Sequence, residues 1–113
     1  MNIEYIPSRG DIVWLEFNPR TGSEQAGRRP ALVISPKSYN QKVGLSLFCP
    51  ITSQVKGYPF EVAIPNNLKI SGVILCDQIK SLDWRNRNAK LICKLPENIL
   101  EDAIAKIKLL IDG

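Results

Sequence analysis

The stretch Asp11-Ile-Val-Trp-Leu-Glu-Phe17 indicates the fold class, because it is dense in residues that favour β-structure. Positions 13, 15 and 17 are apolar, whereas Trp14 and Glu16 occupy the alternate positions. Successive side chains of a strand point to opposite faces, so this alternation predicts a first strand with one face on the core.

Similar apolar runs between turn residues predict further strands. Residues 31–35 and 45–51 are predicted as buried strands, and residues 37–41 as a helical turn between them. Weaker strand patterns occupy residues 60–64, 71–77 and 88–95. Several short strands joined by long loops predict a mainly β protein, built as a strongly bent sheet or a small barrel.

The pattern changes from Pro96 on, where apolar residues recur at helical spacing. They are Leu100, Ala103, Ile104, Ile107, Leu110 and Ile111. This spacing predicts an amphipathic C-terminal helix with Pro96 in its first turn, whose apolar face covers the open side of the sheet.

Composition narrows the function classes. The 113 residues are predicted to form one domain, residues 1–113, and the net charge of +4 favours an anionic partner such as nucleic acid. The chain has no histidine, which excludes histidine acid–base chemistry, Ser-His-Asp triads and histidine metal sites. We expect neither a metal nor another cofactor.

The cysteines and the hydropathy pattern bear on the compartment. Cys49, Cys76 and Cys93 are isolated and lie in apolar runs, so we expect free, buried thiols in a reducing cytoplasm. The sequence has no basic-then-apolar leader and no apolar run of the ~18 residues that span a membrane. We therefore expect a cytoplasmic protein without a membrane partner.

Residues 18–30 are polar and punctuated by Gly and Pro, which predicts a long functional loop. Arg20, Glu24, Arg28 and Arg29 fall within it. Guanidinium groups bind phosphate in a bidentate manner, and a carboxylate can accept a proton, so these residues fit a phosphate-handling site. They fit a solvated loop with an arginine–glutamate pair equally well.

Residues at the ends of predicted strands are also candidates for phosphate contact. Pro30 favours extended backbone at Arg29, which places that side chain at the mouth of a strand. Thr52 and Ser53 follow another strand, where a hydroxyl either binds phosphate or, more commonly, caps a turn.

Trp84 lies in a polar segment beside Arg85 and Arg87. Aromatic and guanidinium planes can stack on unpaired bases, so this segment is a candidate RNA contact. The alternative is a tryptophan that folds back and seals one end of the core.

Motifs over nearly the whole chain resemble those of the MazF/PemK family of toxin endoribonucleases. The motifs, in chain order, are Gly10-Asp-Ile-Val-Trp14, Gly22-Ser-Glu-Gln-Ala-Gly-Arg-Arg-Pro30, Pro30-Ala-Leu-Val-Ile-Ser-Pro36, Pro50-Ile-Thr52, Lys56-Gly-Tyr-Pro-Phe-Glu61 and Asp77-Gln-Ile-Lys-Ser81, followed by the terminal apolar helix. The resemblance implies a small SH3-like β-barrel with a C-terminal helix, as in MazF and CcdB proteins.

It also implies a type II toxin that acts as a homodimer and cuts single-stranded mRNA at short sequences without a metal or the ribosome. The products would carry a 2′,3′-cyclic phosphate and a 5′-hydroxyl. The expected partner is a cognate antitoxin with an acidic, partly disordered segment.

Site residues follow from the same resemblance. The family's catalytic arginine and threonine fall on Arg29 and Thr52, and the loop glutamate of close relatives falls on Glu24. Arg29 would stabilise charge on the phosphorane, Thr52 would hold the scissile phosphate, and Glu24 or Arg29 would accept the 2′-hydroxyl proton. The wider set expected to contact RNA is Arg20, Ser23, Gln25, Arg28, Ser53, Lys56, Gln78, Lys80, Trp84, Arg85 and Arg87.

Two other functions fit parts of this pattern. A toxin similar to the CcdB gyrase poisons would share the fold and lack nuclease activity. A passive RNA-binding barrel would fit the charge and Trp84, and would bind RNA with a strong salt dependence without cutting it. The combination of Glu24, Arg29 and Thr52 favours the nuclease.

Overall fold

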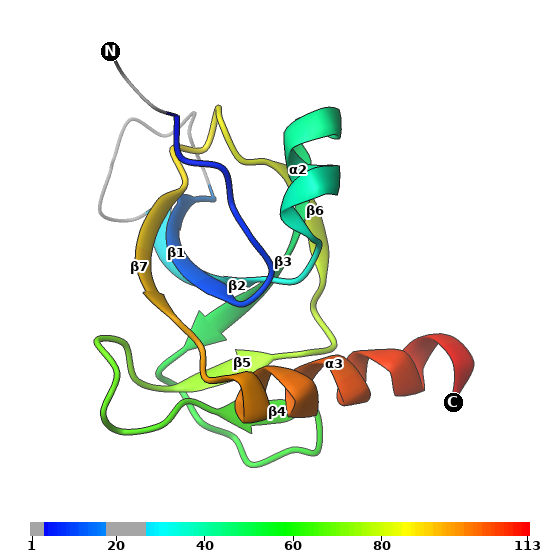
Figure 1. The fold of residues 1–113 in the computed structure, drawn as a ribbon. Coiled ribbons are helices and arrows are strands. Elements are labelled where there is room, and N and C mark those ends of the chain that lie inside the picture. Colours follow the sequence, from blue (N-terminus) through cyan, green and yellow to red (C-terminus); the bar gives the residue numbers. More distant parts are fainter. Residues whose placement is uncertain (1–3, 18–26) are drawn as a thin grey trace.

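The computed structural model describes residues 4–17 and 27–113 of the chain. Within this part the elements follow one another as β1 (Asp11–Glu16), β2 (Arg28–Val33), α2 (Lys37–Val43), β3 (Leu45–Thr52), β4 (Glu61–Ala63), β5 (Val73–Leu75), β6 (Lys80–Asp83), β7 (Lys90–Lys94) and α3 (Glu97–Asp112) (Figure 1). The predicted strands and both predicted helices are therefore confirmed. Strand β6 was not predicted, because its short polar sequence carries no apolar alternation.

The strands form one antiparallel sheet in the order β4-β5-β3-β2-β1-β7, with β6 also paired to β3. Strand β3 pairs with three other strands. Its residues 45–48 pair with β6 and its residues 51–52 pair with β5, while β2 pairs with its other edge. The sheet therefore divides at β3 into two parts that point in different directions (Figure 1).

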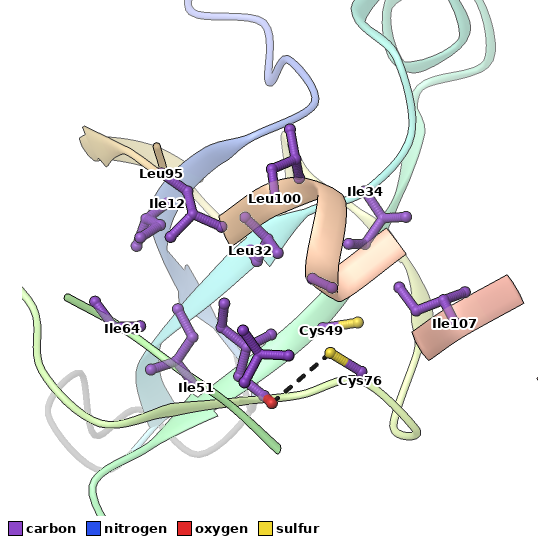
Figure 2. Close-up of a cluster of buried hydrophobic side chains, with 13 residues drawn as sticks. Ile12, Leu32, Ile34, Cys49, Ile51, Ile64, Cys76, Leu95, Leu100 and Ile107 are labelled. Atoms are coloured by element: carbon purple, nitrogen blue, oxygen red, sulfur yellow. Dashed lines mark hydrogen bonds between the residues drawn. The ribbon is translucent and has the colours of Figure 1, made fainter. Parts of the chain in front are cut away.

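The mainly β fold class is confirmed, but the predicted barrel is not closed by strand pairing in the described part of the chain. Strands β4 and β7 are the two ends of the hydrogen-bonded order. Strands β4 and β5 are only three residues long, so they offer few backbone groups for a further pairing. Helix α3 covers the apolar side of the sheet instead (Figure 2).

Both faces of the central strands are buried, in two clusters of apolar side chains. The alternation predicted for β1 is confirmed, since Val13 and Leu15 lie in one cluster with Phe48 and Trp84. Ile12, which precedes Val13 and points to the opposite face, lies in the other cluster, against the buried face of α3 (Figure 2). The strand ends that carry the candidate site therefore emerge from a well-packed core.

Helix α3 buries less of its apolar face than the sequence predicts. Leu100, Ala103 and Ile107 are buried against the sheet, whereas Leu110 and Ile111 are 50% and 79% exposed. The prediction was wrong for these last two residues, because the final turns of α3 extend past the strands (Figure 1).

The cysteines are free, as predicted. Cys49 and Cys76 are buried and Cys93 is half-buried. Burial raises the pKa of the Cys49 thiol to about 12 and that of Cys76 to about 11. In the described residues, no helix combines the length and apolar character needed to cross a membrane.

Candidate active site

The described structure contains an open cleft of about 770 Å³, called here the main cleft. It lies where β2 begins and β3 ends. Its lining residues are Arg28, Arg29, Pro30, Ile51, Thr52, Ser53, Gln54, Lys69, Ile70 and Ser71. The cleft thus brings together four residues predicted from the sequence: Arg28, Arg29, Thr52 and Ser53.

Strand register explains why Arg29 and Thr52 meet. Strands β2 and β3 are antiparallel, and Ala31 lies opposite Pro50. Two residues further toward the cleft, the same register brings Arg29 level with Thr52. Arg29 is exposed at the start of β2, as the sequence predicts from the proline that follows it.

The Thr52 hydroxyl is able to serve both roles that the sequence left open, turn capping and phosphate binding. Its Oγ1 accepts a hydrogen bond from the backbone N–H of Gln54 at 3.1 Å, so the hydroxyl caps the turn after β3. A hydroxyl can donate one hydrogen bond while it accepts others. The Thr52 hydroxyl therefore remains able to donate to a phosphate oxygen in the main cleft.

A second hollow of about 370 Å³, the side cleft, adjoins the first and shares Thr52 and Gln54 with it. Its other lining residues are Lys56, Tyr58, Glu61, Leu75 and Gln78. The predicted RNA contacts Lys56 and Gln78 therefore lie beside the main cleft. Amide, hydroxyl and ammonium groups around one apolar side chain suit a nucleobase.

The loop that bounds the side cleft is held by side chains of β4, of the turn after β5 and of α3. Glu61 accepts hydrogen bonds from the backbone N–H groups of Lys56 (3.0 Å) and Gly57 (2.8 Å). The Tyr58 hydroxyl donates to Asp77 Oδ1 at 2.9 Å, which raises the pKa of Tyr58. Lys106 Nζ of α3 donates to the Pro59 carbonyl at 2.7 Å.

Two cations are positioned over aromatic rings. The Arg28 guanidinium lies 4.4 Å from the Trp14 ring centroid, and the Lys80 ammonium lies 5.6 Å from that of Phe17. Cation–π contact restrains Arg28 where it lines the main cleft. Lys80 lines neither cleft.

The predicted base-stacking role of Trp84 is wrong for this structure. Trp84 is only 2% exposed, and its indole N–H donates to the Asn40 carbonyl at 2.9 Å. Its rings fill one of the two core clusters, so no face is accessible to a base. The alternative, a tryptophan that seals the core, is the one observed.

The neighbouring arginines are also engaged within the protein and line neither cleft. Arg85 pairs with Glu4 at 2.7 Å and stacks at 4.5 Å on the Trp84 ring. Arg87 donates to two main-chain carbonyls that precede the predicted loop, at 3.1 and 2.8 Å. Both arginines therefore brace the protein in this structure, and their contacts with RNA stay predictions.

Arg20, Ser23, Glu24 and Gln25 lie outside the described residues. Within the described part, no carboxylate lines the main cleft, and no group of three potential metal ligands occurs. The structure adds Lys69, Ile70 and Ser71 to the site, which the sequence analysis missed. Their only sequence signal is their place in a polar turn, residues 65–72, that precedes an apolar run.

A guanidinium, a hydroxyl and further cations around one open cleft can hold a phosphodiester and stabilise added negative charge on it. The family model for the PemK-like, MazF-like toxin of type II toxin-antitoxin system matches residues 8–111. The chain belongs to this family. The motifs quoted from the sequence therefore reflect common ancestry, and the resemblance is confirmed.

Individual relatives agree in sequence and in structure. The chain is 48% identical over 107 residues to the endoribonuclease toxin MazF of Escherichia coli (strain K12), covering 95% of this chain and 96% of that protein. It matches a crystal structure of MazF from Deinococcus radiodurans with a TM-score of 0.87 and 48% identity, covering 97% and 100% of the two chains. A MazE-MazF structure from the same organism matches with a TM-score of 0.87 and 45% identity, covering 96% and 98%.

Proposed function

We propose that this protein is the toxin of a type II toxin–antitoxin pair and a sequence-specific endoribonuclease that cuts single-stranded mRNA. Cleavage needs neither a metal nor the ribosome and stops translation and growth. The observation that carries this proposal is the main cleft, where strand register brings Arg29 and Thr52 together in a member of the MazF-like family.

The proposed reaction is an internal transesterification. The 2′-oxygen of the RNA attacks the adjacent phosphorus, the bond to the 5′-oxygen breaks, and the products carry a 2′,3′-cyclic phosphate and a 5′-hydroxyl. Arg29 stabilises the charge of the phosphorane, and the Thr52 hydroxyl donates to a phosphate oxygen. Glu24 accepts the 2′-hydroxyl proton, because arginine is a poor base at neutral pH. The leaving 5′-oxygen takes a proton from solvent.

Further parts of the proposal rest on relatives. MazE-MazF structures support a cognate antitoxin as partner. We further propose that the antitoxin binds through an acidic, partly disordered segment. The family match over residues 8–111 supports one toxin domain over residues 1–113. We also propose that the protein works as a homodimer in the cytoplasm.

The test is incubation of the purified protein with a long single-stranded RNA in EDTA, with mapping of the cut ends. We expect discrete wild-type cuts at one short motif. Arg29→Ala and Thr52→Ala should each lower the rate by about 10²- to 10³-fold, the usual cost of one preorganised donor. Lys42→Ala and Ser38→Ala on α2 are matched controls that remove a charge and a hydroxyl from residues that line neither cleft.

The alternative is a CcdB-like toxin that poisons gyrase and leaves RNA intact. The names of the relatives above favour the nuclease. Intact RNA together with gyrase-dependent breaks in supercoiled DNA would reverse this choice, and salt-dependent RNA binding without cutting would indicate a passive binder.

A further inference from the structure

The wall of the main cleft opposite Arg28 and Arg29 is formed by the turn of residues 65–72, between β4 and β5. Lys69, Ile70 and Ser71 of this turn line the cleft. The proposed mechanism gives none of them a role. Their placement bears on how the RNA strand crosses the site.

The turn is fixed to the rest of the molecule on both sides of Lys69. Leu68 and Ile70 are half-buried and pack against the larger core cluster. The backbone N–H of Ile64 donates to the Gly72 carbonyl at 3.0 Å, which closes the turn. Lys69 therefore lies between two apolar anchors, and its exposed side chain lines the cleft from a restrained backbone.

Gly72 holds the end of the turn directly against the strand that carries Thr52. A β-carbon at position 72 would lie 2.2 Å from the Thr52 carbonyl oxygen, and its φ of +121° suits glycine. No side chain fits between the two backbones. The distance across the cleft is thus set by main-chain contact rather than by the chance position of a surface loop.

The charge around the cleft exceeds what one phosphate requires. Arg28 and Arg29 line one wall and Lys69 the other. Among the described residues, no carboxylate lies within ion-pair distance of Lys69. A groove with cations on both walls follows the backbone of a single strand through more than one phosphate.

We propose that Lys69 binds a backbone phosphate of single-stranded RNA next to the scissile one, so that the strand passes between the start of β2 and the turn of residues 65–72. This inference rests on the proposed function, since Arg29 and Thr52 are taken to hold the scissile phosphate. Lys69 contributes a sequence-independent contact, because an ammonium bound to phosphate does not read the base.

The test measures RNA affinity against salt concentration with a fluorescent oligonucleotide. The oligonucleotide carries the mapped cut sequence with 2′-deoxyribose at the cut nucleotide, so that it binds without being cleaved. Each phosphate contact on a single strand contributes about 0.7 to the slope of log K against log salt. Lys69→Ala should lower the slope by about 0.7 and weaken binding about five-fold at 0.1 M salt.

Lys69→Arg should restore the slope, and Lys42→Ala, which removes a charge on α2, should leave it unchanged. If Lys69→Ala keeps the wild-type slope while the wild-type protein cuts RNA, the role of Lys69 is overturned and the proposed function stands. If the wild-type protein cuts no RNA, the proposed function fails and this inference fails with it.

Discussion

The contact between Gly72 and Thr52 makes Gly72→Ala the sharpest test of how the active site is positioned. The new β-carbon would lie 2.2 Å from the Thr52 carbonyl oxygen and 2.9 Å from its carbonyl carbon. The two strands must separate by about 1 Å to restore an ordinary contact. Because Thr52 lies at the end of β3, most of this shift falls on the residue that is proposed to hold the phosphate.

A displacement of about 1 Å in a catalytic group costs on the order of 10²-fold in rate, or about 2.7 kcal/mol of transition-state stabilisation. We therefore expect kcat of Gly72→Ala to fall about 100-fold, with a smaller change in KM. The variant should also lose about 1–3 kcal/mol of stability, because alanine is strained at a positive φ.

Gly44→Ala is a control that introduces backbone strain at a positive φ without displacing Thr52. Gly44 ends α2 with a φ of +81°, and an added β-carbon would meet only Arg85 Nη1 at 3.7 Å, an ordinary contact. This control should lose stability and keep wild-type cutting below its melting temperature.

Single-turnover cleavage of a short RNA measures the cutting rate of each variant, and thermal unfolding measures its stability. The double variant Gly72→Ala/Thr52→Ala tests the mechanism, since interacting residues give non-additive effects. If Gly72 acts through Thr52, the double variant cuts as slowly as Thr52→Ala. A further 100-fold loss in the double variant, or wild-type kcat in Gly72→Ala, would refute the reasoning.

Two further predictions concern the core. Trp84→Phe removes the hydrogen bond to the buried Asn40 carbonyl, so we expect a loss of about 1–2 kcal/mol in the free energy of unfolding, measured in urea, with RNA affinity unchanged. A selective loss of RNA affinity at unchanged stability would contradict this and show that Trp84 contacts RNA. Burial raises the pKa of Cys49 from 9.0 to about 12 and that of Cys76 from 9.0 to about 11. As pH rises, the unfolded chain therefore loses these protons before the folded protein does. The free energy of unfolding should then fall as pH rises above about 9. The decline should be shallower in Cys76→Ala; an identical decline would show that other groups cause it.

The sequence predicted those elements whose patterns are strong. The alternation in β1 reflects the buried face of Val13 and Leu15, although Ile12 on the other face is buried too. The helical spacing after Pro96 reflects the one buried face of α3. The prediction failed for Leu110 and Ile111, because helical spacing says which side of a helix is apolar but not how far the sheet beneath it extends.

Trp84 shows a different limit. Its polar neighbours suggested exposure, but the partner of its indole N–H is the Asn40 carbonyl, 44 positions away on α2. Nothing local in the sequence signals such a bond. The intramolecular partners of Arg85 and Arg87 are equally hard to predict, since Glu4, Glu16 and Phe17 are distant from them in sequence.

The candidate site was predicted in part. Family motifs identified Arg29 and Thr52 without any geometry, and the strand register then explained their proximity. Lys69 has no motif, and its relevance depends on the anchors Leu68 and Ile70 and on the close approach at Gly72. A role set by backbone packing cannot be recognised from residue type.

The strand ends that carry Arg29 and Thr52 are joined by the pairing of β2 with β3, and each has further support of its own. Pairing of β2 with β1 and β3 fixes the backbone of Arg29, whereas the turn bond from Gln54 and the contact with Gly72 fix Thr52. Hydrogen-bond donors that are fixed before the substrate binds do not have to reorganise during the reaction. A chain without histidine can therefore catalyse transesterification by charge stabilisation and orientation, provided that these strand ends keep their register.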